Sequence, residues 1–128
     1  MKILLDTHVL LWAIAEPARL SRKARRILLD EETELVLSVA SILEIQLKRR
    51  ARKLRLPEDP GFLPQHLKRL GINSLLPVLP DHAYRVRDLD RSHKDPFDCL
   101  LAAQCLSERL PLLSTDPAFA RLGVRVVW

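Results

Sequence analysis

Four of the sixteen acidic residues occupy positions that could hold a metal ion or support hydrolysis. Two of them follow short apolar runs that are typical of buried strands, and the other two lie in the first turns of apolar segments that are typical of helices. The remaining acids stand in polar stretches, where a solvated surface is expected. The four candidates are Asp6, Glu44, Asp98 and Asp116.

These carboxylates predict a site for a hard cation. Side chains that leave strand ends and the first turns of the following helices converge at one edge of an α/β sheet, where helix N-termini favour negative charge. Four carboxylates without compensation would repel one another, and some would be protonated. Mg²⁺ or Mn²⁺, as one ion or as two, resolves this conflict and supports attack of water on a phosphodiester. Zinc is a poor match, because the set contains no histidine or thiolate.

The segment His93–Gln104, read as HKDPFDCLLAAQ, also admits a purely structural interpretation. Asp95 is a good N-cap, Pro96 fits the first helical position, and Asp98 in the first turn interacts favourably with the helix dipole. Taken alone, capping is the more economical explanation. The three acids elsewhere in the chain favour a metal role for Asp98, with the cap as its scaffold and Asp95 as a capping or indirectly acting residue.

Other polar residues stand beside the four acids. Thr7 follows Asp6, and Ser114 and Thr115 precede Asp116. Their hydroxyls could hydrogen-bond a carboxylate, a water on the metal or a phosphate oxygen. His8 and His93 are also close in sequence, but neither spacing is typical of a metal ligand, and structural hydrogen bonding is expected of them rather than general acid–base catalysis.

Strands alternate with helices along the chain, which predicts a three-layer α/β/α sandwich with a central, mainly parallel sheet. One domain over residues 1–128 accommodates this pattern. Ligands of such sheets bind outside the carboxyl ends of the strands. Strands are expected at 2–5, 35–37, 75–79, 110–113 and 124–128, and helices over 9–14, from Ser21, over 42–47 behind a Ser41 cap, over 65–70 before Gly71, over 80–89 and from Asp95.

The chain is basic, with 21 Lys and Arg against 16 Asp and Glu, a net charge of +5 and a pI of about 9.7. This balance favours polyanionic partners, although it does not require one. A basic stretch follows the Glu44 helix, and phosphate binding and an ordinary exposed helix end explain it equally well. It comprises Lys48, Arg49, Arg50, Arg52, Lys53 and Arg55.

The two cysteines and the apolar runs indicate the cellular compartment of the protein. Cys99 and Cys105 are six residues apart on one expected helix, so their side chains point in different directions and no disulfide is predicted. Asp6 and His8 interrupt the only segment that resembles a secretory signal, and no apolar run is long enough to span a membrane. A reduced, cytoplasmic location is expected.

Four segments of the chain resemble, in order, the signature segments of PIN-domain proteins, and in particular the VapC toxins of toxin–antitoxin pairs. Together they span nearly the whole chain, and it is their order that makes the resemblance specific. The segments are Met1–Trp12, Ser38–Ile45, His93–Asp98 with Leu100–Gln104, and Leu112–Asp116 with Ala118-Phe119.

The resemblance implies a Mg²⁺- or Mn²⁺-dependent endoribonuclease of a type II toxin–antitoxin system, often acting on structured RNA. It further implies a small VapB-like antitoxin as partner and a homodimer, and it assigns Asp6, Glu44, Asp98 and Asp116 to the acidic cluster. Two positions depart from the pattern. Leu43 stands where relatives often have Trp, and Cys99 where they often have Arg, which removes a possible phosphate contact.

Two other functions remain open. In a haloacid-dehalogenase-type phosphotransferase an Asp after the first strand is a nucleophile, but such enzymes generally have a second acid two residues on, where this chain has His8. Alternatively, the chain is a non-catalytic basic RNA-binding module whose acids are caps and surface charges.

Overall fold

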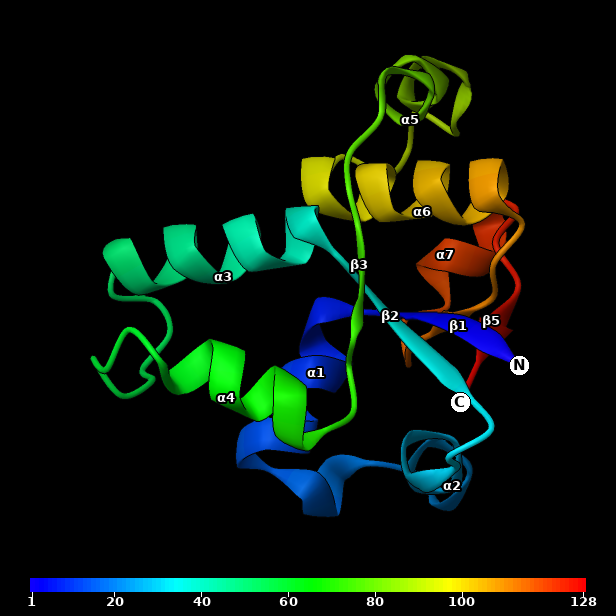
Figure 1. The fold of residues 1–128 in the computed structure, drawn as a ribbon. Helices are drawn as coiled ribbons and strands as arrows, with labels where there is room; N and C mark the ends of the chain where they lie inside the picture. Colours follow the sequence, from blue (N-terminus) through cyan, green and yellow to red (C-terminus); the bar gives the residue numbers. More distant parts are fainter.

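The computed structural model describes all 128 residues and has five strands and seven α-helices (Figure 1). The 3₁₀ turns Pro17–Arg19 and Val86–Asp88 complete it. In chain order the elements are β1 (Lys2–Leu5), α1 (Thr7–Ala15), α2 (Arg22–Leu29), β2 (Glu34–Ser38), α3 (Val39–Arg50), α4 (Phe62–Arg69), β3 (Ser74–Leu76), α5 (Pro80–Arg85), α6 (Pro96–Glu108), β4 (Leu112–Leu113), α7 (Ala118–Arg121) and β5 (Val126–Val127).

All five strands are parallel and lie in the order β3-β2-β1-β4-β5. The chain builds outward from β1 to β2 and β3, and then returns to place β4 and β5 on the other side of β1. The strand order therefore reverses between β1 and β4. In open parallel sheets the crevice at such a switch point is where ligands bind.

Helices cover both faces of the sheet, as Figure 1 shows with α6 and α7 on one side and α1, α2 and α4 on the other. Because side chains alternate along a strand, Ile3 and Leu5 of β1 enter one buried cluster and Leu4 enters the other. The three-layer α/β/α sandwich with a parallel sheet is confirmed.

Several predicted boundaries were wrong by a few residues. The helix placed behind Ser41 begins three residues earlier, because the hydroxyl of Ser38 at the end of β2 accepts the hydrogen bond from the Ala40 backbone N–H (3.0 Å). This makes Ser38 the cap and leaves Ser41 buried inside α3. The expected strand at 75–79 occupies Ser74–Leu76, and the expected helix at 80–89 is α5 followed by a 3₁₀ turn.

Other expectations are confirmed. Gly71 ends α4 with a positive φ of 75°, a conformation that costs glycine little. Cys99 and Cys105 are free thiols, both buried on α6. None of the helices combines the length and apolar character that crossing a membrane requires.

Candidate active site

Asp6 lies at the switch point, directly after β1, and Ser114 lies beside it, directly after β4. The Asp6 N–H donates to the Leu113 carbonyl (3.0 Å), which continues the pairing of the two strands. The Ser114 hydroxyl donates to Asp6 Oδ2 (2.6 Å) and accepts from the Asp116 backbone N–H (3.0 Å). Asp6 is 4% exposed and Ser114 is fully buried. One hydroxyl thus connects two of the four predicted acids.

Replacing this hydroxyl is expected to be costly. Ser114→Ala leaves buried Asp6 Oδ2 and the Asp116 N–H without their partner, so the free energy of unfolding should fall by about 1–3 kcal/mol. Denaturant unfolding measures it. Thr115→Ala is the matched control, because Thr115 is exposed. Equal stability of the two variants would contradict the role of the Ser114 hydroxyl.

Glu44 reaches the same region from α3. It is buried, and its Oε2 forms an ion pair with Lys48 Nζ (3.0 Å) one turn later. Thr7 at the start of α1 donates to the Ser41 hydroxyl (2.9 Å), so it joins α1 to α3 rather than contacting a carboxylate. This bond fixes α3 relative to the end of β1.

Asp98 is positioned by the cap that the sequence predicted. Asp95 Oδ1 accepts from the backbone N–H groups of Phe97 (2.9 Å) and Asp98 (3.1 Å), and Pro96 is the first residue of α6. His93 Nε2 lies 3.0 Å from Asp98 Oδ2. Asp98 is therefore held from two sides, by the helix start and by the imidazole.

Asp116 is held at the turn that leads into α7. Its Oδ1 accepts from the Ala118 backbone N–H (2.9 Å), which fixes the turn into α7, and its own N–H is bonded to Ser114. Its side chain is half-buried. Thr115, the other predicted hydroxyl, is exposed.

Charge repulsion couples three of the acids. Burial raises the pKa of Asp6, and the charge of Glu44 also raises it. The hydrogen bond from Ser114 and the charge of His8 lower it in part. Burial likewise raises the pKa of Asp98, with Asp95 and Asp6 adding to the effect and His93 opposing it. Asp6 thus interacts with Glu44 on one side and with Asp98 on the other.

No three His, Cys, Asp or Glu side chains gather closely enough to ligate one ion as they stand. Each predicted acid is instead bonded to its own partner: Ser114, Lys48, His93 or the Ala118 N–H. The chemistry of the donor set nevertheless fits a hard cation. Its oxygen donors are carboxylates, two of them have raised pKa values because of burial and like charge, and Mg²⁺ or Mn²⁺ would relieve that repulsion.

The basic stretch does not act as one surface. Lys48 points to Glu44, and Lys53 and Arg55 line a cavity of about 470 Å³ with His8 and Trp12, next to the acids. Arg49, Arg50 and Arg52 line a second, adjoining cavity with Gln46, and Arg55 lines both. Residues two apart in a helix point in nearly opposite directions, so Gln46 faces away from Glu44.

Three contacts were not predicted. The Glu44–Lys48 pair has a local signal, the spacing of four residues on a helix. The His93–Asp98 and Thr7–Ser41 bonds depend on how the loop before α6 and the helix α3 are placed. Cys99, which replaces a possible phosphate-binding arginine, is buried and donates its thiol to the His93 carbonyl (Sγ–O 3.4 Å), so it supports the loop that carries His93.

Comparisons with known proteins agree with this architecture. A family model described as the PIN domain matches residues 3–125. No curated protein matches the sequence significantly. Solved structures match over nearly the whole chain.

A chain of VapBC2 from Rickettsia felis, solved bound to a DNA fragment from its promoter, has a TM-score of 0.73 at 14% identity, covering 99% of this chain and 98% of that one. A chain of FitAcB from Neisseria gonorrhoeae has a TM-score of 0.67 at 23% identity, covering 100% and 97%. A toxin–antitoxin complex from Klebsiella pneumoniae has a TM-score of 0.63 at 17% identity, covering 98% and 96%. At these identities the similarity concerns the fold.

Proposed function

This chain belongs to the PIN-domain family, and we propose that it is a metal-dependent endoribonuclease whose single domain spans residues 1–128. The observation that carries the proposal is the placement of Asp6, Glu44 and Asp98 at the switch point of a parallel sheet, where burial and the charges of neighbouring acids raise the pKa of Asp6 and of Asp98. Such an arrangement destabilises the fold unless it serves a cation, and strained polar sites of this kind are typical of function.

In this proposal Asp6, Glu44, Asp98 and Asp116 hold Mg²⁺, or alternatively Mn²⁺. A bound cation lowers the pKa of water and neutralises charge on a phosphodiester. The chain's own groups orient the ligands: Ser114 aims Asp6 and the Asp116 backbone, His93 aims Asp98, and the Asp95 cap sets the start of α6. Lys48 balances the charge of Glu44.

RNA is the substrate class that the surroundings support. Lys48, Lys53, Arg55 and His8 surround the cavity next to the acids, where a polyanion would be attracted. The same cavity has an apolar side formed by Leu11, Trp12, Leu54 and Leu56. A nucleotide next to the cleaved bond would find cationic and apolar contacts there.

The test is direct. The purified chain, free of any partner, is incubated with total cellular RNA in Mg²⁺ or Mn²⁺, with and without EDTA. Endonucleolytic fragments that require the metal support the proposal. RNA that stays intact in both metals would falsify it and favour the non-catalytic RNA-binding module. Transfer of phosphate from a small phosphomonoester would instead favour the phosphotransferase.

We further propose that the chain is the toxin of a type II toxin–antitoxin pair and acts in the cytoplasm. The similarity to chains of VapBC2, FitAcB and the Klebsiella complex supports a small VapB-like antitoxin as its partner. The adjacent reading frame provides the test: a gene for a small DNA-binding protein is expected there. If the protein that it encodes, co-expressed with this chain, neither binds it nor suppresses its toxicity, the antitoxin proposal is wrong.

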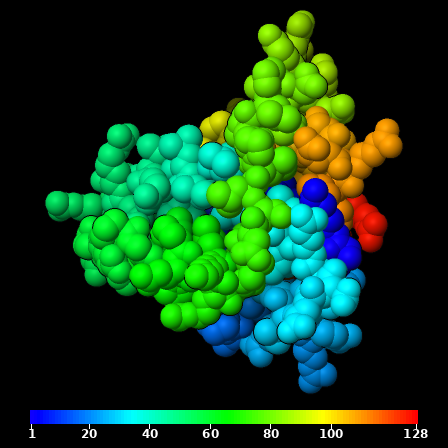
Figure 2. Space-filling model, in the orientation of Figure 1, coloured from blue at the N-terminus to red at the C-terminus, as the bar shows by residue number.

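A homodimer is supported by apolar side chains left exposed on the edge strand β3, on the loop that follows it and on α5. Leu75, Val78, Leu79 and Tyr84 are each exposed, Tyr84 by 79%. Figure 2 shows the segment that contains α5, in yellow-green, projecting from the body of the molecule. A second copy of the chain would cover this surface, since isolated apolar patches on projecting elements mark interfaces.

Tyr84→Glu is expected to weaken self-association by at least about 30-fold, because a charge replaces an aromatic anchor. Leu29→Glu is the matched control, since Leu29 on α2 is equally exposed, at 82%, but lies outside this surface. Analytical ultracentrifugation measures both variants. A dimer that survives Tyr84→Glu would place the interface elsewhere.

A further inference from the structure

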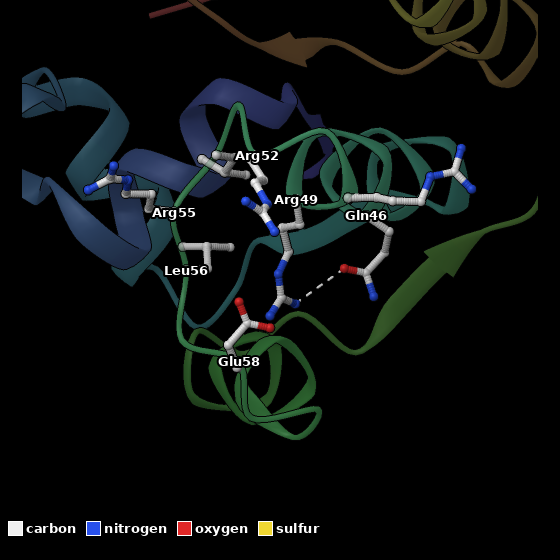
Figure 3. A pocket seen from close by; sticks show the side chains of 8 residues that line it. Gln46, Arg49, Arg52, Arg55, Leu56 and Glu58 are labelled. Carbon is white, nitrogen blue, oxygen red and sulfur yellow. Dashed lines mark hydrogen bonds between the residues drawn. The ribbon is translucent and has the colours of Figure 1, made fainter.

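A basic concavity lies outside the acidic site. It has a volume of about 700 Å³ and is formed by the C-terminal half of α3 and the chain that follows it. Figure 3 shows Arg49 between Gln46 and Glu58, with Arg52 and Arg55 on the chain that follows α3. Four of the eight lining residues are arginines and one is acidic, Glu58; the arginines are Arg49, Arg50, Arg52 and Arg55.

The charge of these arginines is not balanced within the chain. None of the four takes part in an ion pair, and Glu58 is the only acid beside them. Arg49 donates to the Pro57 carbonyl (2.6 Å) and to Gln46 Oε1 (3.2 Å), so it links α3 to the chain that follows it. The other three guanidiniums make no hydrogen bond to the protein. Their donors are free for a ligand.

The cavity adjoins the one next to the acids, because Leu54, Arg55 and Leu56 line both. Arg49, Arg50 and Arg52 line only the arginine cavity. Arg50 lies six residues beyond Glu44, which is about 9 Å further along the axis of α3. A ligand that contacts both cavities follows the chain after α3.

We propose that this arginine cavity binds backbone phosphates of the RNA substrate remote from the cleaved bond, a proposal that rests on the nuclease function above. Guanidinium groups bind phosphate oxygens through two parallel hydrogen bonds, which suits unpaired arginines better than single-point lysine contacts. Folded RNA, recognised by shape and by its phosphates, brings separate strands close together and can present phosphates to both adjoining cavities at once. A short single strand bound at the acids supplies fewer phosphates, so the arginine cavity favours structured RNA.

Two arginines of this chain provide a matched pair for the test. Arg52 and Arg109 both end a helix in the left-handed region, with φ of 57° and 55°. Arg52 lines the cavity. Arg109 follows the last residue of α6 and does not line the cavity. Gly71 occupies the corresponding position after α4. Substitution to glycine at either arginine relieves the strain of the left-handed backbone conformation and removes one positive charge.

The experiment measures binding of total tRNA, and of a short single-stranded oligonucleotide, across a salt titration. It uses the full chain carrying Asp98→Asn so that cleavage does not interfere. In that background Arg52→Gly and Arg50→Gln are expected to weaken tRNA binding about 3–10-fold each and to lower the slope of log K against log salt by about one. The loss should be smaller for the oligonucleotide, and Arg109→Gly should bind tRNA like its parent.

Folding does not obscure the result, because Arg52→Gly and Arg109→Gly should both raise Tm by a few degrees. Equal tRNA affinities for the two glycine variants would overturn the proposal. Weaker binding of a polyglutamate peptide with unchanged binding of tRNA would also overturn it, in favour of an acidic protein segment. Failure of the nuclease function is a separate outcome, since it appears as intact RNA with the unsubstituted chain.

Discussion

Asp98→Asn is expected to reduce metal-dependent RNA cleavage by on the order of 10²–10⁴-fold, because loss of one carboxylate weakens a site worth several kcal/mol of transition-state stabilisation. The chain should stay folded. An asparagine oxygen can still accept from His93 Nε2, and the Asp95 cap does not depend on the side chain at position 98. Removing the charge also removes the repulsion by Asp6 that helps to raise the pKa of Asp98. The Tm without metal should therefore be equal or slightly higher.

Two measurements separate a metal role from a structural one. Mg²⁺ or Mn²⁺ should raise the Tm of the unsubstituted chain, because a ligand of the native state stabilises it, and should raise the Tm of Asp98→Asn much less. Asp88→Asn is the matched control, since Asp88 is an exposed acid outside the site. Full cleavage activity in Asp98→Asn would show that Asp98 serves only the start of α6.

Phe119→Ala is expected to lower the free energy of unfolding by about 3–5 kcal/mol, the usual cost of truncating a fully buried phenylalanine. Phe119 is fully buried in the cluster that joins α6 and α7 to the sheet, where it packs with Leu4 and Leu112. It also lies beside His93, with 6.3 Å between the ring centroids. The substitution thus opens a cavity directly beneath the residues that position Asp98 and Asp116. Urea unfolding followed by circular dichroism measures the loss.

Phe62→Ala is the control for Phe119→Ala. Phe62 starts α4, is only half-buried and packs against His66 at 4.2 Å between ring centroids. Its truncation should lower the free energy of unfolding by on the order of 1 kcal/mol. The substitution removes less buried apolar surface, and neighbouring side chains or water can fill the space. Similar losses for the two variants would contradict the assignment of Phe119 to the centre of the second cluster.

Much of the fold follows from local sequence. The apolar runs before Asp6 and before Ser114 identify β1 and β4, and the Asp95-Pro96 pair marks the start of α6 to the residue. These signals are local because burial sets the periodicity of each element and capping involves neighbours in the chain. The position of Glu44 on a helix after β2 follows in the same way. The misplaced start of α3 arose because Ser38 and Ser41 are both acceptable caps, and only the length of β2 distinguishes them.

The sequence by itself therefore determined the alternation of strands and helices, the parallel sheet and the identity of the candidate acids. Only the tertiary structure decided that β4 lies beside β1, that Ser114 bridges Asp6 to Asp116, and that the basic residues line two adjoining cavities that share Arg55. The physical reason is the range of the interactions. Caps and burial patterns are fixed within one or two turns, whereas strand order and side-chain partners depend on packing between segments as far apart as Asp6 and Ser114, which no local pattern encodes.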